Sequence, residues 1–361
     1  MATQGVRPIL SSEIRQSISA VADRARAGGS LGSDLEVIIS ALSLIPAGAR
    51  EQVEAEVRWC GQLSPYYSVP VIVSERPWPA WLAAKKPEDA KETLRRTPRL
   101  AHLYVFHGSG YARQAALDAW NCPPDSPLFL AAIASRLNDW VAEVRAAAKR
   151  CAETWFPHTS AEVVAGAFGH LVERQDVLSR WSGEESQLVA DMLYRKDVLA
   201  IVADQLVRSL SGPAQRTLRY ALRRPGLDAT LLRLATDAAK PDIRAAALKT
   251  LIERRVTWTS CFEKQWVDKR YRIARRVPVT AGRDIAHDLD VQQLLRLFAI
   301  DRRTLVRKTV ASALIDRLGN ATSSDFEIAR QLAHDKSPAV SGKALYFLEH
   351  ATRAYAPEAE G

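Results

Sequence analysis

Hydrophobic and polar positions follow a helical period along most of the chain. In SDLEVIISALSLI (33–45) and VQQLLRLFAI (291–300), apolar residues recur three and four positions apart, which is the spacing of an amphipathic helix. Alternation with a period of two, which would indicate strands, is nearly absent. We therefore predict an all-α protein that is almost entirely helical over residues 100–352.

A short motif recurs within these helical segments. Asp139 stands six residues before Arg145, which follows a Val and opens a run of small residues, and Asp301 stands six before Arg307 in the same context. Asp237 precedes Arg244 by seven residues. The spacing between successive anchors is 28 to 36 residues, a period that predicts stacked helix pairs in an α-solenoid. The anchors lie at positions 113, 145, near 180, 216, 244, 272, 307 and 341.

These units resemble HEAT repeats, particularly the short kind found in bacterial HEAT-like and phycobilisome-lyase-like proteins. The resemblance covers roughly residues 100–352 and implies a right-handed superhelix of about seven or eight helix pairs. In that family the Asp caps the second helix and the Arg reaches a neighbouring repeat, so Arg145 is expected to be structural. The matching residues are Asp139, Val144, Arg145, Asp237, Ile243, Arg244, Asp301, Val306, Arg307, Asp335, Pro338 and Val340.

The ends of the chain differ from the repeats. Residues 1–99 are predicted to form an atypical N-terminal cap, helical at first and then irregular over 65–99, where prolines exclude a continuous helix. Residues 353–361 form a short tail. Aromatic residues in the irregular segment either pack on the first repeat or anchor a partner. They are Tyr66, Tyr67, Trp78 and Trp81.

Charge is concentrated in one region of the chain. The formal net charge is +9, and residues 216–280 contain 16 Lys or Arg against 6 Asp or Glu. Arg216, Arg219 and Arg223 have the spacing of one helix face. KQWVDKRYRIARR (264–276) interleaves cations with aromatic rings, a mixture that suits phosphates and stacked bases. Its candidate binding residues are Lys269, Arg270, Arg272, Arg275 and Arg276.

Candidate catalytic motifs have simpler structural explanations. The His-Asp pairs at 287–288 and 334–335 fit helix caps and repeat turns, and Ser109 lies in a turn that caps a helix rather than in a nucleophile loop. The four cysteines are far apart, which argues against a zinc or redox site. We predict no catalytic residues, no metal and no cofactor. Trp140 and Trp155 are predicted to lie in the core.

Two functions are compatible with these patterns. The first is a scaffold without catalytic activity that binds a protein partner on its concave face, although an enzymatic role is left open. The second is a nucleic-acid binder that uses the 216–280 patch, since the chain is similar in repeat type and basicity to bacterial HEAT-like DNA glycosylases. A weaker third possibility is a cofactor lyase, because similar repeats occur in bilin lyases. No signal peptide or membrane-spanning run is found, so we expect a cytoplasmic protein without membrane association, of undetermined oligomeric state.

Overall fold

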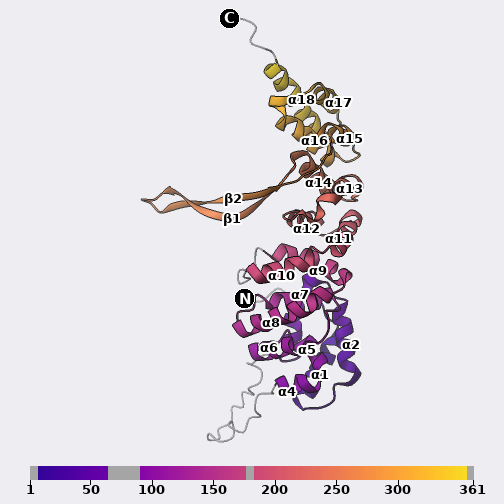
Figure 1. Ribbon diagram of the computed structural model, residues 1–361, viewed down its shortest axis with the longest axis vertical. Coiled ribbons are helices and arrows are strands. Elements are labelled where there is room, and N and C mark those ends of the chain that lie inside the picture. The colour runs from indigo at the N-terminus through magenta and orange to yellow at the C-terminus, as the bar shows by residue number, and fades with distance from the viewer. Residues whose placement is uncertain (1–6, 64–89, 176–182, 356–361) are drawn as a thin grey trace. The chain divides into compact units, whose positions relative to one another are not determined.

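The computed structural model describes residues 7–63, 90–175 and 183–355, and within them the chain is mostly helical (Figure 1). The fold class is therefore all-α, as predicted, with one exception over residues 255–284. The chain divides into two compact units, residues 1–201 and 202–361. The predicted boundary between residues 99 and 100 lies inside the first unit. Tyr66, Tyr67, Trp78, Trp81 and the repeat anchor near 180 lie outside the described residues.

The first unit is a set of short helices that pack on one another. Helices α6 and α8 pack together, as do α7 and α9, so that each contacts the helix two places further along the chain. Pro127 begins α7, and the Ser126 hydroxyl caps it by accepting from Phe129 N at 3.3 Å. The main helices are α1 (Ser12–Arg26), α2 (Gly32–Ser43), α3 (Arg50–Cys60), α4 (Ala90–Arg96), α5 (Ala101–Tyr104), α6 (Gly110–Asp118), α7 (Pro127–Arg136), α8 (Ala142–Trp155), α9 (Ala161–Arg174) and α10 (Gly183–Leu193).

The second unit repeats a helix-pair arrangement. Helix α14 packs on α16 and α16 packs on α18, while α13, α15 and α17 each pack on the helix that follows. Small residues such as Ala247 and Ala311 are fully buried where these helices meet, which lets their backbones approach closely. The helices are α12 (Ala214–Ala221), α13 (Leu231–Asp237), α14 (Pro241–Glu253), α15 (Val291–Ala299), α16 (Thr304–Asp316), α17 (Ser323–Ala333) and α18 (Pro338–Tyr355), with α11 (Lys196–Arg208) crossing the boundary between the units.

A β-hairpin interrupts the second unit between α14 and α15. Strand β1 (Arg255–Asp268) pairs antiparallel with β2 (Ile273–Asp284), from Arg255 opposite Asp284 to Asp268 opposite Ile273. In Figure 1 the hairpin extends away from the helices of its unit. The prediction of helix throughout 100–352 is therefore wrong here, and the anchor at position 272 lies in the hairpin turn. Val, Thr and aromatic side chains in β1 favour a strand over a helix.

No single helix among the described residues is long and apolar enough to cross a bilayer. Helix α2 and the segment Ala47–Cys60 pass such a test only when taken together, across a bend of 107°.

Candidate functional site

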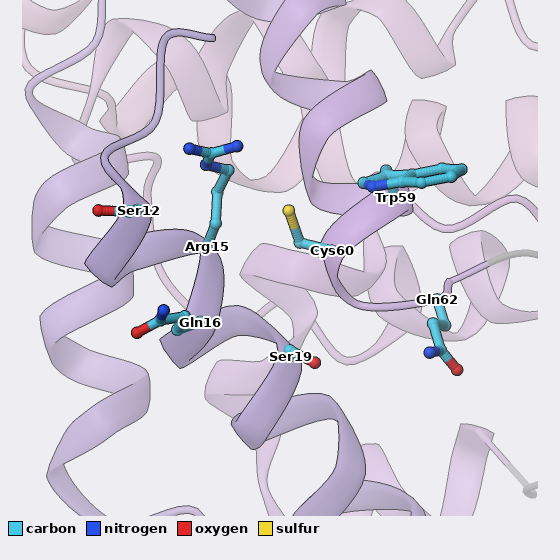
Figure 2. Close-up of a pocket in the computed structure, with 7 residues that line it drawn as sticks. All are labelled: Ser12, Arg15, Gln16, Ser19, Trp59, Cys60 and Gln62. Carbon is cyan, nitrogen blue, oxygen red and sulfur yellow. The ribbon is translucent and has the colours of Figure 1, made fainter.

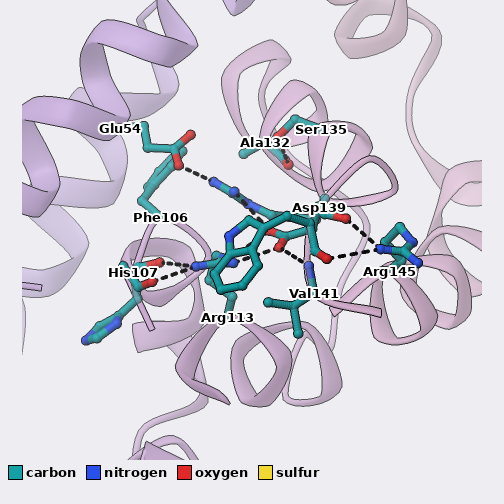
Figure 3. Close-up of polar contacts among 12 residues, drawn as sticks. Glu54, Phe106, His107, Arg113, Ala132, Ser135, Asp139, Val141 and Arg145 are labelled. Atoms are coloured by element: carbon teal, nitrogen blue, oxygen red, sulfur yellow. Dashed lines mark hydrogen bonds and ion pairs between the residues drawn. The ribbon is translucent and has the colours of Figure 1, made fainter. Parts of the chain in front are cut away.

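Buried arginines join the turns of successive helix pairs in the first unit (Figure 3). Arg113 donates two hydrogen bonds to the Asp139 carboxylate, at 2.7 and 2.8 Å, and both side chains are almost fully buried. Arg113 also donates to the carbonyl oxygens of His107 and Gly108, both at 2.9 Å. One guanidinium thus fastens its own turn and the next one. Charge-assisted bidentate bonds of this kind fix orientation as well as adding energy.

The same arrangement recurs in the second unit. Arg307 donates to both oxygens of Asp335, at 2.5 and 3.0 Å, and to the Asp301 carbonyl oxygen at 2.8 Å. Arg244 forms a buried ion pair with Asp301. The Arg307 bonds lower the pKa of Asp335, while burial acts against them. These pairs match the structural role predicted from the repeated motif.

Arg145, the residue of the first repeat motif, makes a different set of bonds. Its guanidinium donates to the carbonyl oxygens of Asp139 at 2.9 Å and Trp140 at 3.4 Å, both in its own turn. No carboxylate partner of Arg145 is found within the described ranges. Arg145 therefore holds its own turn rather than bridging two turns there.

The outer part of the hairpin is exposed on both faces. No residue from Thr257 to Asp284 is buried, and neither strand edge is paired with another described strand. The two strands and their turn contain eight Lys or Arg against three Asp or Glu. Two strands alone are marginally stable in water. The large apolar side chains left exposed here are Phe262, Trp266, Val267, Tyr271 and Ile273.

The pairing register divides these side chains between two faces. Phe262 pairs with Pro278, Lys264 with Arg276, and Trp266 with Ala274, so these six side chains share one face. The Lys264 ammonium lies 3.8 Å from the centre of the Trp266 ring, which confirms that the two side chains lie together. Arg275 lies on the opposite face, where its Nε donates to Gln265 at 2.7 Å. One face therefore alternates aromatic and cationic groups.

The base of the hairpin is fastened to the helices that precede it. Arg283 donates to both oxygens of Asp228, at 2.5 and 2.7 Å, and to the Leu222 and Arg224 carbonyl oxygens at 2.7 and 3.0 Å. Gly282 is required opposite β1, since a Cβ atom there would lie 2.7 Å from the Val256 carbonyl oxygen. The hairpin is thus firmly held at its base, and its outer residues are exposed or half-buried among the described residues.

The structure brings part of the predicted basic patch together. Arg216 and Arg219 lie exposed on α12, whereas Arg223 follows the end of that helix. Arg223 is half-buried and lies 4.2 Å from the Tyr220 ring and 5.7 Å from the Trp258 ring at the hairpin base. The prediction that Arg223 shares an exposed helix face is therefore wrong. The remaining predicted residues are all exposed in the hairpin or its turn, namely Lys269, Arg270, Arg272, Arg275 and Arg276.

The residues with possible catalytic roles have structural partners. Asp290 caps α15 by accepting from Gln292 N at 2.9 Å, and the His287 ring bonds the Leu251 carbonyl oxygen at 2.8 Å. Ser109 is the N-cap residue of α6. No group of three metal-ligating side chains is found among the described residues.

A shallow pocket of about 610 Å³ lies between α1 and the end of α3 (Figure 2). Arg15, Gln16 and other α1 side chains face Trp59 and Cys60 across it. Burial raises the pKa of the Cys60 thiol, although Arg15 acts in the opposite direction. A thiol whose pKa is raised is a poor nucleophile at neutral pH, so this pocket does not offer an activated cysteine.

Comparison with known proteins identifies no family for this chain. No protein-family model matches the chain, and no curated protein matches it. The resemblance to HEAT repeats stays a prediction that rests on the repeated motif.

Proposed function

We propose that this protein binds nucleic acid through the β1–β2 hairpin, which extends from helix pairs stacked as a HEAT-like α-solenoid. The observation that carries the proposal is the exposed face shared by Phe262, Lys264, Trp266 and Arg276. Cations at this spacing neutralise successive phosphates, and exposed rings stack on bases. The sequence predicts a basic patch on helices, whereas these four residues lie exposed on a hairpin.

The dimensions of a two-stranded ribbon also suit nucleic acid. The major groove of duplex DNA admits such a ribbon, and exposed aromatic rings suit single strands. The hairpin has few carboxylates to repel phosphate, and Asp268 is occupied in accepting from the backbone N–H groups of Arg270 and Tyr271 at the turn. The ligand class that follows is a polyanion with accessible bases or grooves.

A direct titration tests this function. Labelled single-stranded DNA, duplex DNA and RNA are titrated with the full chain at about 150 mM salt, where non-specific dissociation constants are about 1–100 μM. The triple variant Lys264→Glu, Arg275→Glu, Arg276→Glu should weaken binding at least about tenfold and flatten its salt dependence. Its control is Arg302→Glu, Arg303→Glu, Lys308→Glu, which reverses three exposed cations of the same unit outside the hairpin.

A protein ligand is the second candidate function, and it corresponds to the scaffold predicted from the sequence. It is favoured by the exposed Phe262, Val267 and Ile273 and by the two unpaired strand edges, which a partner strand can extend. Saturable binding to none of the nucleic acids would reject the first proposal. Capture of a protein partner that persists after nuclease treatment, and that is lost when the hairpin is truncated, would then support the second.

A further inference from the structure

A second polar site lies in the first unit, away from the hairpin in sequence. It is a cleft of about 390 Å³ between α3, α7 and α9. Arg50 and Glu54 line it from α3, Arg136 from the end of α7, and His170 and Arg174 from α9. The turn after α7 adds Trp140, whose side chain is 73% exposed. The prediction that Trp140 lies in the core is therefore wrong, because the turn directs it outward.

The lining of this cleft holds three arginines and three carboxylates, and two further arginines, Arg58 and Arg113, pair with those carboxylates from behind it. Glu54 accepts from Arg50, Arg58 and Arg136. Asp139 accepts from Arg113 and Arg136, and Glu51 accepts from Arg50 and Arg174. The network thus contains five guanidinium groups and three carboxylates, so its formal charge is +2. The excess arises because each carboxylate is shared by two or three arginines.

The excess positive charge lowers the stability of the folded protein, because much of it is buried. The Arg50 and Arg136 side chains are only 10% and 8% exposed, and the Nε–H group of each is buried without a hydrogen-bond partner. Burial, together with the charge of Arg136, lowers the pKa of Arg50 despite Glu54. A buried network with more cations than carboxylates destabilises a fold unless a further counter-charge reaches it.

His170 reports the same positive environment. Burial, together with the charges of Arg174 and Arg50, lowers its pKa to about 4, and Glu51 opposes them. The ring is therefore neutral at pH 7. A neutral imidazole retains one N–H donor and does not repel an anion.

We propose that this cleft binds a phosphate monoester dianion, with the phosphoryl group among Arg50, Arg136 and Arg174 and the organic part toward Trp140. The charge of −2 matches the excess of +2 in the network. Guanidinium groups bind phosphate oxygens in a fork geometry. Arg174 is one-third exposed and pairs only with Glu51 among the described residues, so it can turn toward a ligand. The exposed indole of Trp140 suits a planar ring, which makes a nucleoside monophosphate the best-matched ligand.

Calorimetric titration of the full chain with inorganic phosphate, glycerol phosphate and adenosine monophosphate tests the site. We expect a dissociation constant of about 0.1–1 mM for the nucleotide, with weaker binding of the other two. Arg174→Gln should weaken all three at least about tenfold. The control is Arg150→Gln, which removes a comparable exposed arginine paired with Asp118 outside the cleft and should leave the affinities unchanged.

A second readout separates binding from folding. NMR titration of the His170 ring should show its pKa rising from about 4 when the nucleotide saturates the site, because the dianion offsets Arg174 and Arg50. Trp140→Ala should reduce nucleotide affinity to that of glycerol phosphate. If the Trp140→Ala variant binds the nucleotide as tightly as the unchanged protein, the placement of the organic part beside Trp140 is wrong. Absence of saturable binding, or equal affinity in the folded Arg174→Gln variant, overturns the site itself. The hairpin triple variant should bind the nucleotide normally, so failure of the proposed function is distinguished from failure here.

Discussion

The arginines of the helix pairs and those of the hairpin are chemically identical but lie in opposite surroundings. Arg113 is 1% exposed and has four acceptors within 2.9 Å, whereas Arg276 is exposed and faces solvent beside Lys264. Removing a buried cation leaves its carboxylate buried without a partner, which strongly destabilises the fold. An exposed cation contributes little to stability and remains available to a ligand. Burial and partners, rather than residue type, therefore separate structural arginines from binding ones.

The largest effect is expected where burial is most complete. Arg113→Ala should lower the free energy of unfolding by about 3–5 kcal/mol, because Asp139 is left buried with only the 3.3 Å bond from Arg136 and one from Val141 N. Urea denaturation followed by circular dichroism measures the change. Adding Asp139→Asn should restore part of the loss, since it removes the unpaired charge. A loss below about 1 kcal/mol would show that Arg113 contributes no more to stability than an exposed arginine does.

A smaller loss is expected at the half-buried pair of the second unit. Arg307→Ala should cost about 1–3 kcal/mol, because it removes two charge-assisted bonds to Asp335. Arg145→Ala should cost less, about 0.5–1.5 kcal/mol, since Arg145 bonds only neutral carbonyl oxygens in the described part of the chain. Thermal and urea denaturation of both variants decide the order. The reverse order would show that Arg145 has a stronger partner elsewhere.

Lowering the pH should reduce the free energy of unfolding of the helical first unit, where two histidines are buried. Burial lowers the pKa of His102, and that of His107, from 6.5 to about 4. The native state stays neutral at these rings while the unfolded chain gains protons below pH 6.5, so stability falls as the pH drops from 6.5 to about 4. The slope should be on the order of 1 kcal/mol per pH unit for each histidine.

A matched variant checks this pH dependence. The His102 ring lies against the Trp120 ring, tilted by 31° with 4.3 Å between centroids, and meets the Phe129 ring edge-on at 4.8 Å. His102→Phe retains an aromatic ring there and removes the titrating group, so its unfolding free energy should decline less steeply between pH 6.5 and 4 than that of the wild type. Equal slopes would exclude His102 as a source of the acid sensitivity.

The smallest effect on stability is expected in the hairpin. Arg275→Ala and Arg276→Ala should change the free energy of unfolding by less than about 0.5 kcal/mol, because both side chains are exposed. Arg276→Ala should weaken nucleic-acid binding, measured by fluorescence anisotropy, more than Arg275→Ala does, because Arg275 lies on the opposite face of the hairpin. Destabilisation as large as that of Arg307→Ala would instead give these residues a structural role, and the hairpin arginines would then not differ from those of the helix pairs.

Local sequence predicted most of the helical regions and the structural role of the repeated Asp and Arg, although Arg145 bonds only its own turn in the described part of the chain. The turn containing Asp139 and the small residues that follow were sufficient, since helical periodicity and capping act over a few residues. The hairpin was missed although RVTWTSCFEKQWVD (255–268) is rich in β-branched and aromatic residues. The repeat period predicts a helical anchor at Arg272, but the β-branched and aromatic residues before it form a strand.

Only the tertiary structure decided which charges are paired. Glu54 and Arg136 are 82 residues apart and Arg283 and Asp228 are 55 apart, so no local pattern joins them. The exposure of Trp140 and the half-burial of Arg223 also depend on neighbours distant in sequence. Periodicity is a property of adjacent residues and is visible in the sequence, whereas the environment of a charge depends on what packs beside it, and that is known only once the helices and the hairpin are in place.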